Sequence, residues 1–225
     1  MTCRSTLCRF LAWAICGLQP AVAFAGTEPG LIYVHTARGD ITVQDSPAGP
    51  VTSLARGAAF AAVGQIVTVP DAHPLVLVLS NGSALCLPDG GQITLKSFTQ
   101  EPVVDTSTDR DYEPTPSQLK LSLAQGSLAL AMRTPKPTST LDIATTFAQL
   151  SCLSRSLVVI ATPDQVSIAV FDGTVDLTIP STGFTETLQA GQFATLDRAS
   201  LTQKYPLKLD AINLVQQQQY GAWLD

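Results

Sequence analysis

Histidine is scarce in this sequence, and its two copies, His35 and His73, stand far apart. No H-x-x-x-H or H-E-x-x-H spacing is therefore present, which excludes the common helical zinc motifs. A G-x-S-x-G elbow is also missing, and Ser83 directly follows Asn81-Gly82, where serine is usual in a turn. The sequence shows no catalytic signature, so we expect no enzymatic activity, no cofactor and no metal.

Basic residues are also few, and the formal net charge is −5. Arg4 and Arg9 precede a short apolar run, Phe10–Leu18, and Ala23-Phe24-Ala25 has the A-x-A form of a cleavage site. This pattern predicts a signal peptide over residues 1–25 and a periplasmic or secreted protein. Removing both arginines makes the chain more acidic and leaves no basic stripe, which argues against a nucleic-acid partner and an anionic membrane surface.

Long hydrophobic runs are absent after the predicted leader. A membrane-spanning helix needs about 20 apolar residues, so we expect no membrane span once the leader is cleaved. Residues 26–225 are enough for one domain with a sizeable core.

Cysteine is rare outside the leader. Of five cysteines, three lie in residues 1–25, and only Cys86 and Cys152 remain. In an oxidising compartment an even number of cysteines allows a disulfide between them. The alternative is two small buried residues with free thiols.

Short strands separated by turns are what the chain has in abundance. Leu75–Leu79 is an apolar run that we expect to be a strand buried on both faces. Asn81-Gly82 is a strong hairpin signal, and Ser83–Leu87 returns with Leu85 and Leu87 on one face. Asp89-Gly90-Gly91 predicts another turn, into Gln92–Leu95.

A repeat supports an all-β fold. Gly39 and Gly57 enclose a strand, a polar turn and a second strand, and Gly173 and Gly191 enclose the same pattern with the same spacing. Such glycine-ended strands are typical of a short-stranded β-solenoid or sandwich. We expect further glycine turns at Gln125-Gly126 and at Asp172-Gly173.

Two segments differ in character from the strands. Gln100–Gln118 is rich in proline, threonine and acids, which predicts a surface loop. In the tail, Asp210 is a candidate N-cap for a helix over Ala211–Gln219 that Gly221 would end. Ile212, Val215 and Trp223 would then pack on the β-body, while the glutamine run would face solvent.

Several of these elements together resemble the FecR-like domain family. The resemblance covers about Gly39 to Arg198, and its motifs are, in order, Gly39–Val43, Leu77–Ser83, Phe98–Pro102, Tyr112–Ser117, Gly126–Leu128 and Leu188–Phe193. Leu141–Thr145 also aligns, but residues 146–156 depart from the T-P-x-G/A and R-G-T-x-F pattern usual in the family. Any role of that segment in relatives is therefore not carried over to this chain.

The resemblance implies an extracytoplasmic all-β domain over residues 26–198, with residues 199–225 as a tail packed on it. Well-known family members carry a transmembrane helix and a cytoplasmic anti-sigma segment, and relay iron-siderophore signals. We expect neither part here, because the chain opens with a leader, and the signalling role is not carried over.

Two functions fit these observations. The first is a non-enzymatic envelope module that binds a protein partner, through an open sheet edge or through the loop Gln100–Gln118. The second is a carbohydrate- or peptidoglycan-associated binding protein or hydrolase, which exposed Tyr112 and Trp223 on one face would favour. The loop residues expected to contact a partner are Glu101, Asp109, Asp111, Tyr112 and Glu113.

Overall fold

The structure is a computed structural model that describes residues 26–71, 73–102 and 111–224. The predicted leader and Asp109 lie outside the described residues. The fold is all-β with one short C-terminal helix, as predicted. Among the described residues, no helix is both long and apolar enough to cross a bilayer.

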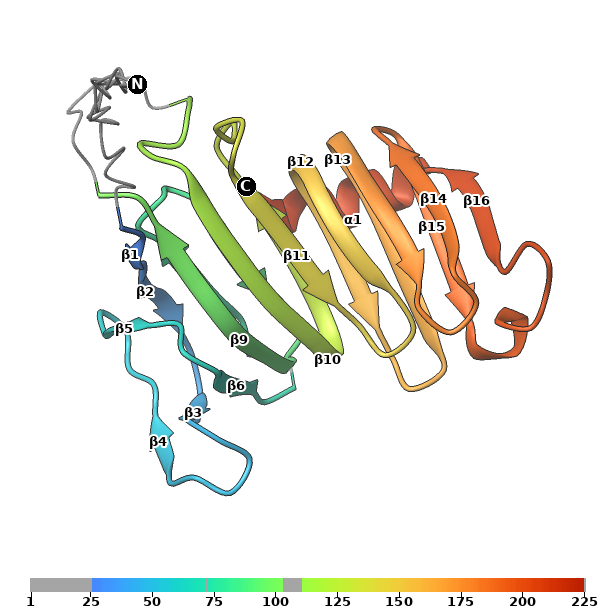
Figure 1. The fold of residues 1–225 in the computed structure, drawn as a ribbon. Coiled ribbons are helices and arrows are strands. Elements are labelled where there is room, and N and C mark those ends of the chain that lie inside the picture. The colour runs from blue at the N-terminus through green and yellow to red at the C-terminus, as the bar shows by residue number, and fades with distance from the viewer. Residues whose placement is uncertain (1–25, 72, 103–110, 225) are drawn as a thin grey trace, which may run out of the picture.

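Among the described residues, sixteen strands form one large mixed sheet. The strands, a 3-10 turn η1 and the helix are β1 (Glu28–Pro29), β2 (Leu31–Ala37), β3 (Thr42–Gln44), β4 (Val51–Ser53), β5 (Ala59–Ala61), β6 (Gln65–Val69), β7 (Leu75–Leu79), β8 (Ala84–Leu87), β9 (Gly91–Gln100), β10 (Ser117–Ala131), β11 (Thr140–Ala144), β12 (Gln149–Ala161), β13 (Gln165–Ile179), β14 (Phe184–Gln189), β15 (Gln192–Asp197), η1 (Arg198–Ser200), β16 (Leu207–Ala211) and α1 (Leu214–Leu224). Figure 1 shows the strands from β9 to β16 side by side, with β16 at one end and α1 behind them.

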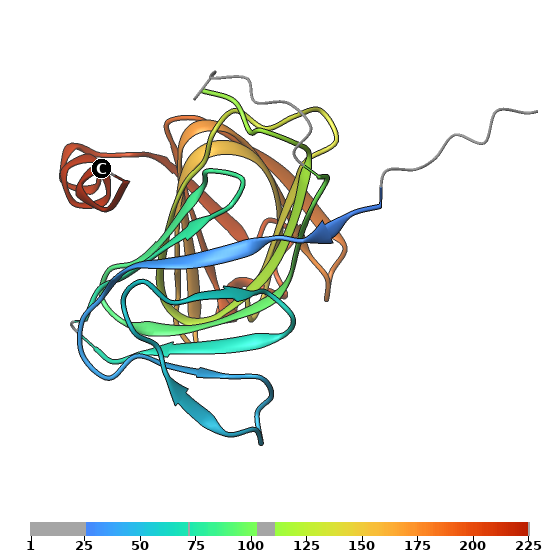
Figure 2. The same cartoon turned by 90° about the vertical axis from the view of Figure 1, so that its left-hand side faces the viewer.

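The sheet folds back on itself into two layers, because the long strands β10, β12 and β13 each bend midway. Their halves 117–123, 149–154 and 173–179 join β9, β11 and β14 in what we call the front layer. Their other halves join β8 and β15 in the back layer, which β2, β7 and β16 extend. Figure 2 shows the strands curving around the interior from one layer to the other.

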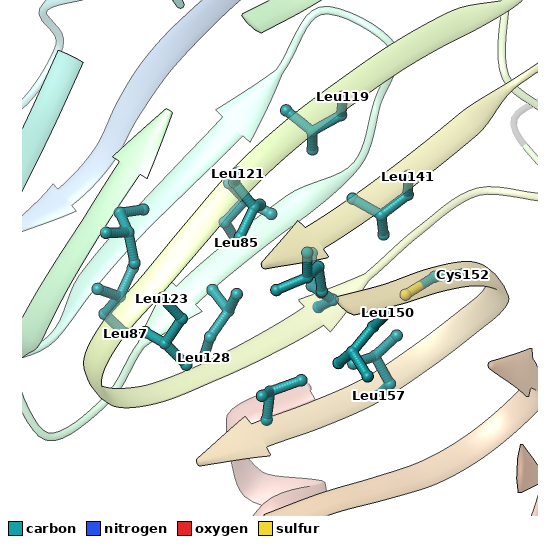
Figure 3. Close-up of a cluster of buried hydrophobic side chains, with 14 of the residues drawn as sticks. Leu85, Leu87, Leu119, Leu121, Leu123, Leu128, Leu141, Leu150, Cys152 and Leu157 are labelled. Carbon is teal, nitrogen blue, oxygen red and sulfur yellow. The ribbon is translucent and has the colours of Figure 1, made fainter. Parts of the chain in front are cut away.

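One apolar core fills the space between the layers. Alternate residues of each strand point into it, as the pleat requires. The front and back halves of β10 bury Leu121 and Leu130 to 1% and 0% exposure. Figure 3 shows leucines of β8, β10, β11 and β12 converging in this core.

The prediction of glycine turns at Gln125-Gly126 and Asp172-Gly173 is wrong. Both glycines lie inside long strands, β10 and β13, where φ is +109° at Gly126 and +89° at Gly173. Each accompanies a register irregularity, opposite β9 and β12 respectively. Positive φ at a bulge bends a strand without ending it, and these bends carry the chain between layers.

The hairpin at Asn81-Gly82 is confirmed. β7 pairs with β8 in antiparallel register, and the amide of Leu79 donates to the carbonyl of Ser83 over 2.8 Å. The expected burial of Leu75–Leu79 on both faces is wrong, because Val76 and Val78 are only half-buried. Val76 and Val78 therefore lie on the outer face of the back layer.

The glycine-bounded repeat corresponds to two equivalent hairpins. β3 pairs with β4, and the front half of β13 pairs with β14. The register relative to the flanking glycines is the same in both, since Val43 faces Thr52 as Leu177 faces Glu186.

The tail differs in detail from the prediction. Asp210 lies in β16, which pairs with β15, and the helix begins at Leu214 and continues through Gly221. Asn213 is the cap: its Oδ1 accepts the amide of Gln216, whose Oε1 accepts the amide of Asn213, both over 2.9 Å.

The helix covers part of the outer face of the back layer. Ile212 and Tyr220 are buried there against Ala129, Val158 and Ala169. The ring of Trp223 lies 5.1 Å from that of Tyr220 and packs on the same cluster. Val215, which was expected to pack inward, is instead 70% exposed.

Candidate functional site

The outer face of the front layer carries a continuous row of polar side chains. In the described part of the chain no helix covers this face, because α1 lies behind the sheet (Figure 1). Each residue of the row is the direct partner of the next one on the neighbouring strand, from β9 to β14. The row is Ser97, Lys120, Asp142, Ser151, Asp176 and Thr187.

Strand alternation explains why these residues share a face. Lys120 lies between the buried Leu119 and Leu121, and the same polar position between two buried neighbours recurs on β11, β12 and β13. Since successive side chains point to opposite faces, burying the apolar neighbours directs each polar residue outward.

Hydroxyl groups on adjacent strands orient both carboxylates of the row. The hydroxyl of Ser151 donates to Oδ1 of Asp142 over 3.2 Å, and that of Thr187 donates to Oδ1 of Asp176 over 2.6 Å. Each carboxylate thus faces the strand that follows it in the layer.

The opposite end of the row is positive. β9 has a register shift opposite Lys120, where Ser97 pairs with Lys120 and Leu95 pairs with Leu121. The extra residue, Lys96, is exposed on the outer face beside Lys120. The row therefore runs from two lysines on β9 and β10 to two aspartates on β11 and β13.

Short side chains hollow the middle of this face. Ala144 and Ser151 lie between the lysines and β13, and a cleft of about 350 Å³ opens above them. A shallower hollow of about 560 Å³ continues over β13 and β14. The two hollows share Asp176 and Thr178, so together they form one polar groove that reaches β14.

β14 is a free edge of the front layer. It pairs only with β13 among the described strands. The amide of Gln189 donates to Oε1 of Gln192 over 2.6 Å instead of to β13. Because backbone groups alternate between the two sides of a strand, Thr185 and Thr187 direct theirs to the open edge.

Cys152 lies beneath the groove, on the inner side of β12 next to Ser151. Burial strongly raises the pKa of its thiol, and the charges of Asp142 and Asp176 raise it further. The thiol is therefore protonated at neutral pH and is a poor nucleophile.

Of the two alternatives for Cys86 and Cys152, a disulfide or two free thiols, the structure has the free thiols. Cys152 points into the main core, whereas Cys86 packs on the outer face of the back layer in the cluster beneath α1. Cys152 therefore lies in the front layer and faces the core, whereas Cys86 lies in the back layer and faces away from the core. Burial also raises the pKa of Cys86, with a further contribution from the charge of Asp89.

The acidic segment expected as a surface contact is only partly exposed. Tyr112 is 47% exposed, and its ring lies 5.8 Å from Nζ of Lys136. Asp111 is also exposed, and its carbonyl accepts the amide of Thr134 over 2.8 Å. Glu101 is half-buried, and its carbonyl accepts the hydroxyl of Thr115 over 2.8 Å.

The prediction that Glu113 contacts a partner is wrong, because this residue is 1% exposed and cannot belong to a contact surface. Its Oε1 accepts hydrogen bonds from Nδ2 of Asn81 over 2.9 Å and from the hydroxyl of Ser117 over 3.0 Å. Its Oε2 accepts the hydroxyl of Ser139 over 2.5 Å and the amide of Lys136 over 3.3 Å. The carboxylate joins the β7–β8 turn, β10 and the segment before β11.

The described residues hold no cluster of three or more histidine, cysteine or acidic side chains that could bind a metal ion. His35 is exposed on β2, and the ring of His73 lies against Gly39. Neither histidine lines the groove.

The groove residues were not predicted from the sequence. The available signal was the repeated polar residue between two apolar ones, in Leu119–Leu123 and in Leu141–Ile143. That pattern predicts an outward side chain, but only the pairing of distant strands shows that four such residues align.

No protein-family model matches the chain, and no curated protein matches it in sequence. Two crystal structures of a "putative anti-sigma factor" from Parabacteroides distasonis share part of the fold. One is 14% identical with a TM-score of 0.49, and the match covers 71% of this chain and 63% of that one. The other is 15% identical with a TM-score of 0.45, covering 71% and 64%. The matches span less than two thirds of those chains, and similarity at this level does not indicate a shared function.

Proposed function

We propose that this protein is a non-enzymatic envelope module that binds an extended segment of a protein partner along the free edge of β14. The observation that carries the proposal is the open edge of β14 at the end of the polar groove. An added strand would pair with the backbone groups at Thr185 and Thr187.

The groove would supply specificity to such pairing. Side chains of an added strand alternate between the two faces of the sheet, so every second one would project over the outer face beside Asp176 and Thr187. The carboxylates of Asp142 and Asp176 favour basic or amide-bearing side chains there, whereas Lys96 and Lys120 favour acidic groups at the far end.

Export and family membership are part of the same proposal. The leader-like residues 1–25 support a periplasmic or secreted location, and the ordered motifs between Gly39 and Arg198 support a FecR-like domain over residues 26–198. Residues 199–225 are its tail, which adds β16 and α1 to the body.

The carbohydrate alternative is less well supported. Sugar sites commonly use an exposed aromatic face, whereas Trp223, on α1, packs against the outer face of the back layer. Tyr112 is exposed, but it lies on the segment before β10 and not in the groove. A polar groove with two aspartates is what remains in favour of a saccharide ligand.

The experiment is affinity capture from an envelope extract with the exported protein and two variants. Thr187→Pro removes an amide that faces the free edge and leaves the β13-facing amides in place. Thr187→Ala is the matched control, because it loses the same hydroxyl and keeps the amide. We expect the wild type and Thr187→Ala to retain one partner that Thr187→Pro loses.

Equal capture by all three proteins would contradict strand addition at β14. Purified cell-wall material supplies the test of the alternative. Co-sedimentation that depends on Asp142 and Asp176, measured with Asp142→Asn and Asp176→Asn, would indicate a saccharide ligand instead.

A further inference from the structure

The last strand of the sheet, β16, has a second open edge, in the back layer. It pairs only with β15 among the described strands, and four of its five residues are exposed. Leu209 at its centre is 41% exposed. On either side of it, Lys208 and Asp210 form an ion pair over 3.2 Å in which both side chains remain largely exposed.

The hydrogen bonding at the end of β16 shows which backbone groups are open. The amide of Ile212 donates to the carbonyl of Gly191 over 2.8 Å, so Ile212 faces β15. Alternation then directs the amides and carbonyls of Lys208 and Asp210 toward β15 as well. Those of Leu207, Leu209 and Ala211 point to the free edge.

This edge is self-complementary, and we propose that it pairs with the same edge of a second copy of the chain. In antiparallel pairing about a two-fold axis at Leu209, each Leu209 faces its counterpart. Lys208 of each copy then faces Asp210 of the other, so opposite charges meet on both sides of the axis. Leu209, whose backbone faces outward, provides the two central hydrogen bonds.

Exposed apolar side chains gather around the same edge. Tyr205 precedes β16 and is 71% exposed, and Leu214 and Val215 follow it at 68% and 70%. Antiparallel pairing about Leu209 brings the start of one copy's β16 to the end of the other's. Tyr205 of one copy would therefore approach the Leu214 and Val215 end of its counterpart, where these side chains lose solvent contact together.

The free edge of β14 does not have this property. Its open backbone groups are at Thr185 and Thr187, and two-fold pairing of β14 about Thr187 would set Glu186 opposite Leu188. Lone lysines on an edge strand usually prevent strand pairing, but in β16 an aspartate two residues away offsets that effect. The inference concerns the back layer and holds whether or not a partner binds at β14.

Sedimentation equilibrium tests the proposal on the full chain, expressed with residues 1–25 and purified after export. We expect a dimer with a dissociation constant in the micromolar range. Lys208→Glu sets carboxylates opposite each other twice per interface and should weaken the dimer about tenfold or more. Asp210→Lys sets ammonium groups opposite each other with the same result.

Mixing the two single variants separates charge pairing from any effect on folding. Lys208→Glu faces Asp210→Lys with opposite charges at both contacts, so the mixture should form a heterodimer although each variant alone is mostly monomeric. Leu209→Pro should abolish the dimer, whereas Leu209→Ala keeps the amide and should weaken it less. A monomeric wild type, or a dimer that Leu209→Pro leaves intact, overturns the proposal.

Discussion

Gly126 of β10 lies directly opposite Gly91 of β9, and no side chain fits between them. A Cβ atom on Gly126 would lie 2.5 Å from the carbonyl oxygen of Gly90 and 2.7 Å from Cα of Gly91. The contact is between two backbones at the point where β10 leaves the front layer.

Gly126→Ala should therefore lower the free energy of unfolding by about 3 kcal/mol or more, because strain at φ +109° adds to a backbone clash. Gly191→Ala is the matched control for positive φ, since its Cβ meets nothing within 4 Å, and should cost about 1 kcal/mol. Gly221→Ala, inside α1, should stabilise by about 0.5–1 kcal/mol. Urea denaturation followed by circular dichroism gives all three values.

An equal loss in Gly126→Ala and Gly191→Ala would show that the close approach of β10 and β9 does not matter. The expected order depends on that contact, because both positions share positive φ.

Glu113→Ala should destabilise the protein by about 2–4 kcal/mol. It leaves the donors of Asn81, Ser117 and Ser139 buried without their acceptor. Glu113→Gln keeps one carbonyl oxygen in place and should lose less. The exposed Glu28 is the control, and Glu28→Ala should stay within about 0.5 kcal/mol of the wild type. A wild-type midpoint for Glu113→Ala in urea would mean that the network contributes nothing to stability.

Cys152 should make the protein less stable in alkaline solution. Burial raises the pKa of its thiol, so above the ordinary value of about 8.5 the unfolded chain releases this proton while the folded chain keeps it. The contribution is complete below that pH, and above it stability falls by about 1.4 kcal/mol per pH unit.

Unfolding free energies of the wild type and Cys152→Ala, measured between about pH 8 and about pH 11, give this slope. That range begins just below the ordinary thiol pKa and ends well above it. The difference between the two proteins should change steadily above that pKa. Parallel curves would assign the alkaline loss to other groups, among them Tyr220, whose pKa burial also raises.

Local signals in the sequence predicted the strands well and their ends less well. Asn81-Gly82 is a turn, and it is recognisable because a short apolar strand lies on each side of it. Gly126 and Gly173 look the same locally, yet they bend strands that continue. A positive φ serves a turn or a bulge equally, and only the pairing of β10 with β9 and β12 distinguishes the two.

The candidate site was harder to predict because its parts are distant in sequence. Glu113 lies in a proline-rich acidic stretch that indicates a surface loop, but its partners Asn81 and Ser139 come from other elements. Lys120, Asp142 and Asp176 align only through three strand pairings. Tyr112 and Asp111 could be placed correctly on the surface because their exposure needs no partner.

The bent strands also constrain the order in which the molecule can fold. The second half of β10 lies between β8 and β12, and β12 follows β11 in the sequence, although β11 belongs to the front layer. The back layer is therefore incomplete until most of the chain is available, and its contacts span long sequence separations. Topologies dominated by contacts of this kind fold slowly, so early fragments of this protein should have little stable tertiary structure.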